Sequence, residues 1–450
     1  MEKLVYGTID YNGKSYPFLL EGRRVNIVGA AWQFYDDFQE ADYEEAISGT
    51  TSDNRQIMFL RCRFEHSTFR NRTWFSPIGY ILSKGNIDDS YDFTFEKVSF
   101  YSEAINSFFP PQSAFETHFD PNNWNGEGTL TFKPFAETGV AFNFESFRCT
   151  SNISRYITMQ PGKSDIGSIN SDFSFEFDNA QHCIALPKYW LAVFDFLSFV
   201  NYGTNIQFDK VKLYKRRPDG LYEHNADAYI FSNQDEYIPR PAQNTITVND
   251  IPTERLGAVF SNISSLRDRD ERLGYYFPRN FQERFQIDAT RWLVAALNFD
   301  GLSTSCYPNF KQNQKEQFRI AKKVALNALD TADQSGMNRK GCGYFKDCRE
   351  QIVRYEGLLE EKFNFLTEKY MDALEDILSY NLQKHNLDAG DYGVIYSRYR
   401  NKIAHGEVSP VGGNEVAVYR VMQALIYFML LEGTGLDNNT LRVIAKKLFL

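Results

Sequence analysis

The spacing of apolar residues changes from a period of two in the first half of the chain to a longer period in the second half. Up to about residue 240, short runs of β-branched and aromatic residues alternate with turn residues such as Asn12-Gly13, which is the pattern of strands joined by tight turns. The clearest strands are predicted at 4–11, 16–20, 56–64, 93–101, 129–132, 140–147, 173–177, 206–214 and 228–231. We expect a sandwich or barrel-like β module, with an aromatic helix at 187–202 covering one face of its sheet.

Past Pro252 the apolar residues recur with the 3.6-residue period of helices, in long stretches without proline or glycine. Helices are predicted at about 253–265, 279–300, 312–333, 347–382, 390–405, 414–432 and 437–448. Gly406 and Gly433 follow two of them as helix stops. The sequence therefore predicts an α+β multidomain chain, with a β-rich domain over 1–245 and an all-α helical bundle over 253–450.

The composition is that of a folded protein, because 43% of the 450 residues are hydrophobic and 24% are charged. No basic and apolar leader opens the chain, since residues 1–7 run directly into a predicted strand. The apolar run at 424–431 is too short to span a bilayer. We therefore expect a cytoplasmic protein without a membrane partner.

The net charge of −9 argues against a protein whose whole surface binds nucleic acid. The charge is unevenly distributed: residues 1–250 contain 22 basic and 33 acidic residues, whereas residues 251–450 contain 27 and 25. A nucleic-acid site is therefore expected in the second half, as a local cleft.

The six cysteines are scattered along the chain, and only Cys342 and Cys348 lie close together. No pair of histidines is near them to complete a zinc site. We expect reduced thiols, with no metal and no cofactor.

The most informative motif is Arg400-Asn401-Lys402-Ile403-Ala404-His405, which ends a predicted helix just before Gly406. Arginine and histidine at a similar spacing also occur at Arg61 and His66, in a predicted strand, and at Arg217 and His224, across a turn. Only the motif at 400–405 lies in a helical region, between a helix end and a strongly apolar helix.

These residue types suit the cleavage of RNA without a metal ion. The 2′-hydroxyl attacks the adjacent phosphate, which requires a base, an acid for the leaving 5′-oxygen and positive charge on the phosphorane. Histidine titrates near neutral pH, and arginine offers a fixed set of donors to phosphate oxygens.

The motif resembles that of the HEPN superfamily, helical bundles whose nucleases carry arginine, usually a polar residue, and then histidine near a helix end. The resemblance covers 253–450, and the pairing of a β-rich half with such a bundle resembles the ApeA type of anti-phage defence protein. It implies a metal-independent endoribonuclease that leaves 2′,3′-cyclic phosphates. It also implies a homodimer or larger even assembly whose composite site contains Arg400, Asn401 and His405 from each copy. An ApeA-type protein would be an abortive-infection effector that cuts host RNA, such as tRNA, after a phage-encoded trigger reaches the N-terminal domain.

Helical geometry leaves the identity of the arginine open. On an ideal helix Arg400 and His405 are about 140° apart, whereas Arg398 and Asn401 share a face with His405. The composition of the motif favours Arg400, because Asn401 follows it directly, and the geometry favours Arg398. Unwinding of the last turn near Gly406 would reorient His405, so we rank Arg400 first and keep Arg398 as the second candidate. The buried stripe of this helix is predicted to consist of Ile395, Tyr399 and Ile403.

Other functions fit the same residues. His405 could cap the carbonyls at a helix end while Arg400 lies in solvent. The chain would then be a non-catalytic ligand-binding protein whose bundle only dimerises. A HEPN toxin controlled by a separate antitoxin is a further alternative.

Overall fold

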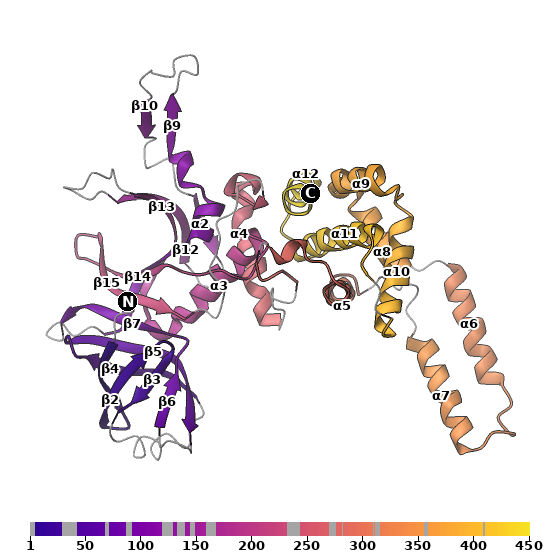
Figure 1. Cartoon of the computed structure of the whole chain (residues 1–450), viewed down its shortest axis with the longest axis horizontal. Coiled ribbons are helices and arrows are strands. Elements are labelled where there is room, and N and C mark those ends of the chain that lie inside the picture. The colour runs from indigo at the N-terminus through magenta and orange to yellow at the C-terminus, as the bar shows by residue number, and fades with distance from the viewer. Residues whose placement is uncertain are drawn as a thin grey trace. The chain divides into compact units, whose positions relative to one another are not determined.

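A computed structural model describes residues 5–28, 43–67, 72–86, 92–118, 129–132, 140–144, 149–158, 168–231, 244–269, 276–280, 282–308, 310, 316–354, 359–407 and 410–450. The chain consists of two compact units, Met1–Phe281 (unit 1) and Gln282–Leu450 (unit 2). Unit 1 contains a β-barrel and an open sheet, and unit 2 is helical (Figure 1). This is the α+β layout that the sequence predicts.

One half of unit 1 is a small closed barrel. Its strands are β1 (Val5–Tyr11), β2 (Lys14–Glu21), β3 (Arg24–Ile27), β4 (Tyr43–Thr51), β5 (Arg55–Ser67) and β6 (Arg72–Ser76). Neighbours pair antiparallel in the order β5-β4-β1-β2-β3-β6, and β6 returns to β5. The barrel is filled by side chains, with Phe59 packed edge-on against Phe18 and Phe75.

The other half of unit 1 is an open sheet. It contains β7 (Gly79–Asn86), β8 (Thr94–Tyr101), β11 (Val140–Phe144), β12 (Cys149–Thr158), β13 (Ser168–His182), β14 (Lys210–Arg216) and β15 (Tyr222–Ile230). The order is β7-β15-β14-β8-β13-β12-β11, entirely antiparallel. The strands β9 (Phe115–His118) and β10 (Thr129–Phe132) form a separate pair.

The strand β5 belongs to both halves. Its first part pairs with β7 as far as Leu60, and its last part pairs along the same edge with β6 from Arg63 onward. Between them Arg61 has a φ of 47°, a backbone conformation that non-glycine residues adopt rarely. The bend at Arg61 thus lets one strand close the barrel and continue the open sheet.

The helix α3 (Leu186–Val200) covers the apolar face of the open sheet, as the aromatic run predicts. Its Tyr189 ring lies 4.8 Å from Phe177 and 5.6 Å from Phe175 of β13. Among the described residues, only Cys183–Val200 is long and apolar enough to cross a membrane, and 72% of it is buried inside the fold. Its apolar composition is thus explained by its place in the core.

The helix α4 (Thr253–Ser264) packs on unit 1, although the sequence analysis assigned it to the helical domain beginning at 253. Its Phe260 is fully buried, with ring centroids 4.6 Å from Phe144, 5.1 Å from Phe196 and 5.2 Å from Phe173. Together with α3 and the short α2 (Glu103–Phe108), it completes the layer on the sheet. The boundary between the compact units therefore follows Phe281.

Unit 2 contains eight helices within its described residues. They are α5 (Ala289–Cys306), α6 (Glu316–Thr331), α7 (Arg339–Arg354), α8 (Leu359–Lys369), α9 (Met371–His385), α10 (Asp391–Ala404), α11 (Gly413–Leu430) and α12 (Asn438–Phe449). The single helix expected at 347–382 spans parts of α7, α8 and α9, and the helix expected at 279–300 begins only at Ala289, where Asp288 caps it. Every residue of α11 from Ala417 to Leu430 except Arg420 is buried, so α11 is the centre of the bundle.

We expect the substitution Phe260→Ala to lower the free energy of unfolding by about 3–5 kcal/mol, because it empties the centre of an aromatic cluster. Chemical denaturation would measure the loss. The exposed Leu221, changed to Ala, serves as a control that should stay within about 0.5 kcal/mol of wild type. Equal stability of the two variants would contradict the assignment of α4 to the core of unit 1.

Candidate functional site

The motif residues lie on the C-terminal half of α10. The helix buries Tyr392, Tyr396, Tyr399 and Ile403, while Ile395 is only half-buried. The buried stripe therefore includes Tyr399 and Ile403, as predicted, but it is centred on the tyrosines rather than on Ile395.

Contacts with α5 and α8 fix the position of α10. A side chain at Gly393 would place its Cβ 2.5 Å from Asn364 Oδ1, and the Gly393 N–H donates to that oxygen at 3.1 Å. The Tyr396 ring stacks on Phe363 of α8 at 4.8 Å, and Trp292 of α5 meets Tyr399 edge-on at 4.9 Å. The helix is thus held on two sides in one rotation about its axis.

The end of α10 is a Schellman motif. The Glu407 N–H donates to the Lys402 carbonyl at 3.1 Å, and the Gly406 N–H donates to the Ile403 carbonyl at 2.9 Å. Gly406 has a φ of 82°, which favours glycine. His405 is the last residue before this turn, and its own N–H donates to the Asn401 carbonyl at 3.1 Å. The backbone of His405 is therefore fixed by the helix end, while its side chain is exposed.

Arg400 is turned toward α5. Its Nε lies 3.8 Å from Oδ2 of Asp300, and Nη1 donates to Oδ1 of Asn401 at 3.4 Å. The Tyr396 hydroxyl donates to Oδ1 of Asp300 at 2.8 Å, and Lys362 of α8 donates to the Asp300 backbone carbonyl at 3.0 Å. A half-buried carboxylate thus contacts a tyrosine and an arginine from successive turns of α10.

Burial raises the pKa of Asp300 above its ordinary value, although the Tyr396 hydrogen bond and the charges of Lys362 and Arg400 oppose this rise. Burial and the neighbouring Asp300 also raise the pKa of Tyr396, so this hydroxyl keeps its proton. The group around Asp300 is therefore a packed polar contact between α5 and α10.

The structure brings Arg398, Asn401 and His405 together on the exposed side of α10, three and four residues apart. Within the part of the chain that is described, neither the Arg398 side chain nor the His405 side chain makes a hydrogen bond or an ion pair. Arg400 is half-buried, and its guanidinium is directed toward Asp300. Of the two arginines that the sequence leaves open, Arg398 is thus the one free to meet a ligand.

The sequence analysis did not single out Asp300 or Lys362. The available signal was a carboxylate inside an otherwise apolar helical run, Trp292 to Phe299 and beyond. Such a residue needs a buried partner, but its partner lies a hundred residues later in the sequence.

No cluster of three or more histidine, cysteine or acidic residues that could hold a metal ion occurs in the described ranges.

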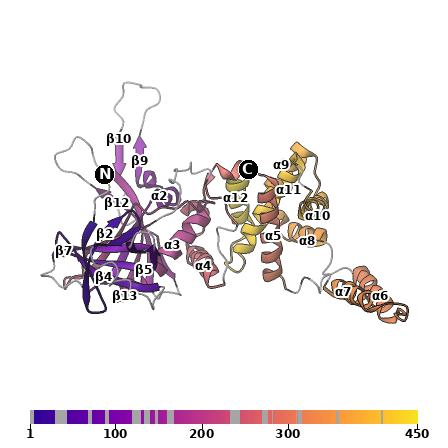
Figure 2. The same cartoon turned by 60° about the horizontal axis from the view of Figure 1, so that its bottom comes forward.

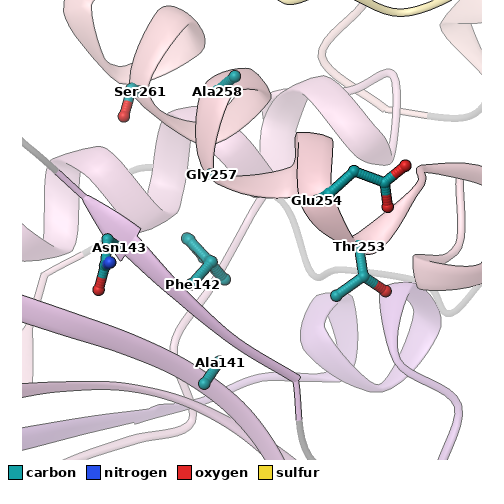
Figure 3. Close-up of a pocket in the computed structure, with 8 residues that line it drawn as sticks. All are labelled: Ala141, Phe142, Asn143, Thr253, Glu254, Gly257, Ala258 and Ser261. Carbon is teal, nitrogen blue, oxygen red and sulfur yellow. The ribbon is translucent and has the colours of Figure 1, made fainter.

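A groove of about 660 Å³ lies elsewhere, in unit 1, between residues 141–143 of β11 and one face of α4 (Figure 3). Gly257 permits this close approach, because a Cβ there would lie 2.9 Å from the Asn143 carbonyl oxygen. Thr253, Glu254 and Ser261 make part of its lining polar, and none of the motif residues lines it.

Comparison of the chain with family models, with curated proteins and with solved structures gives no match.

We expect the two arginines to differ in their effect on stability. Arg400→Ala removes a cation from the half-buried Asp300 and should lower the free energy of unfolding by about 1 kcal/mol. Arg398→Ala, its matched control on the same helix, should change it by less than about 0.5 kcal/mol. Chemical denaturation of both variants beside the wild type tests this, and an equal effect would show that the Asp300 contact contributes nothing.

The raised pKa of Asp300 makes a prediction about pH. A carboxyl whose pKa is higher in the folded chain than in the unfolded chain binds its proton more tightly when the chain is folded. Its contribution to stability is therefore present at acid pH and is lost as the pH rises through the raised pKa. Asp300→Asn keeps an oxygen for Tyr396 but does not titrate. We therefore expect the unfolding free energy of wild type minus that of Asp300→Asn to decrease as the pH rises from 3.8, the ordinary value. A difference that is constant with pH, or that increases, would contradict the raised pKa.

Proposed function

We propose that this chain is a metal-independent endoribonuclease of the HEPN kind. The observation that carries the proposal is the exposed group Arg398, Asn401 and His405 at the fixed C-terminal end of α10, in a helical bundle. It joins an imidazole and a guanidinium on one face of one helix. These are the groups that RNA cleavage through the 2′-hydroxyl requires.

One copy of the motif supplies a single histidine, whereas cleavage needs both a base and an acid. We therefore assign the active form to a homodimer or a larger even assembly in which two α10 ends face each other. The exposure of Arg398 and His405 supports this assignment, because both side chains remain available to a second copy and to RNA. Arg400, in contact with Asp300, then orients α10 and adds positive charge behind Asn401.

In this proposal unit 1 is the sensor. Residues 1–250 carry eleven more acidic than basic residues, so this part of the chain repels RNA until a trigger changes its position. The proposed role is that of a cytoplasmic abortive-infection effector: a phage component binds unit 1, and unit 2 then cuts host RNA.

The substitution His405→Ala tests the proposal. We expect it to reduce RNA cleavage by the purified chain at least about 100-fold, the effect of removing a general acid or base, and to abolish the death of phage-infected cells. The measurements are cleavage of total host RNA by the purified chain, with a metal chelator and an extract of phage-infected cells present, and cell survival with and without infection.

The control is Lys402→Ala, an exposed residue of the same turn, which should cleave RNA within a few-fold of wild type. If His405→Ala folds and assembles normally and still cleaves RNA like the control, the nuclease proposal is wrong. If the wild type cuts no RNA even with the extract of phage-infected cells present, the bundle serves for binding or dimerisation alone. Killing of uninfected cells that ceases only with a separate inhibitor would identify a toxin of a toxin–antitoxin pair instead.

A further inference from the structure

The helices α6 and α7 form a hairpin, here called the arm (residues 316–354). In the described part of unit 2 they pack chiefly on each other, and Figures 1 and 2 both show them side by side. An ion pair joins Arg349 Nε to Asp330 Oδ1 at 2.6 Å, and Lys322 donates to the Val353 carbonyl at 2.9 Å. The arm is therefore a defined pair of helices rather than an extended loop.

The arm has no buried core. None of the described side chains from 319 to 353 is buried, whereas every residue of α11 from Ala417 to Leu430 except Arg420 is buried. Its large apolar side chains are exposed instead: Ile320 46%, Met337 40%, Val324 62%, Tyr344 70% and Val353 48%. Ile320 and Val324 are one turn apart, so they form an apolar stripe on α6.

Two helices of this length gain most of their stability from packing of their apolar faces. A helix pair that exposes its apolar residues is typical of a surface that another protein covers. RNA would neutralise the basic residues of the arm, but it would leave Ile320 and Val324 in water. The occupant that the arm fits is therefore a protein surface with apolar and acidic groups.

A second copy of the chain offers such a surface. The arm contains eight basic and five acidic residues, whereas residues 359–385, which form α8 and α9, contain six acidic and three basic residues. Glu375 and Asp376 pair with Arg442 of α12, and Lys369 pairs with Glu432, which leaves four acidic and two basic residues of α8 and α9 for a partner. The apolar side chains of Met371 and Leu382 on α9 are exposed by 44% and 47%. If the basic arm of each copy contacts the acidic helices α8 and α9 of the other, the dimer has two identical contacts. These are related by a two-fold axis.

We propose that the arm binds α8 and α9 of a second copy, and that the arm of the second copy binds α8 and α9 of the first, which gives a symmetric dimer. The inference extends the proposed function, which needs two copies for its composite site, and it rests on the surface of the arm itself. The attraction between opposite charges makes the association weaker as the salt concentration rises.

The test compares the dissociation constants of full-length variants by sedimentation velocity. We expect the wild type to be a dimer, and we expect Ile320→Ser combined with Val324→Ser to raise the dissociation constant at least about ten-fold, or about 1.4 kcal/mol. Both side chains are exposed, so the variant should fold. Leu221→Ser is the matched control, because Leu221 is 63% exposed and Val324 is 62% exposed. It should leave the dissociation constant unchanged.

A charge test addresses the partner surface. Lys323→Glu combined with Lys346→Glu should weaken the dimer, and addition of Glu361→Lys and Glu368→Lys should restore it. A monomeric wild type would overturn the inference. An arm variant that dimerises as well as Leu221→Ser would also overturn it. This includes a variant that still dimerises but no longer binds an RNA oligomer, since the arm would then bind RNA instead of a second copy. A wild-type dimer that cleaves no RNA would contradict the proposed nuclease but not the proposed role of the arm. An arm variant that remains a dimer and cleaves RNA would contradict only the role of the arm.

Discussion

The contact between Asp300 of α5 and α10 determines which side of α10 the molecule presents. A half-buried carboxylate at a helix contact is stabilised by donors and positive charge, and the Tyr396 hydroxyl and the Arg400 guanidinium supply them from successive turns of α10. This requirement fixes the rotation of α10. When Arg400 is directed inward, the face of α10 that carries Arg398 and Asn401 is directed outward. His405 lies on the same face, at the end of the helix. A rotation that exposed Arg400 would leave Asp300 with Lys362 alone as its cation, and would bury polar residues in the place of Arg400.

This dependence explains how much of the candidate site could be predicted from the sequence. The helix, its end at Gly406 and the polar character of Arg400, Asn401 and His405 are local properties, and periodicity together with a helix-stop glycine is enough to find them. The availability of an arginine is not local, because it depends on a carboxylate one hundred residues earlier. The sequence could therefore state the alternatives Arg398 and Arg400 and rank Arg400 first from the motif, but it could not show that Arg400 contacts Asp300. The tyrosines that replace Ile395 at the centre of the buried stripe illustrate the same limit, since the surrounding helices decide which apolar residues are covered.

The same distinction applies to the fold. Alternating strands and the aromatic helix α3 could be predicted, because burial on one face repeats in the sequence with the period of the element. Closure of the barrel could not, since it depends on the switch of one strand from β7 to β6. The helix α4 has the helical pattern of the second half of the chain, and only the insertion of Phe260 between aromatic rings of β11, β13 and α3 assigns it to unit 1. The boundary between α8 and α9 at Tyr370 could not be predicted either, because no proline or glycine marks it in the sequence.

The shared strand β5 has a consequence for the thermodynamics of unit 1. Two domains joined by a linker can unfold one after the other, but a barrel and a sheet that use the same strand lose hydrogen bonds together when that strand detaches. Since the backbone of β5 continues through the bend at Arg61, the barrel and the open sheet form one cooperative folding unit. A molecule that binds anywhere on unit 1 in its folded state therefore stabilises both halves by the same free energy, and binding at the barrel is coupled to the order of the helices that cover the sheet.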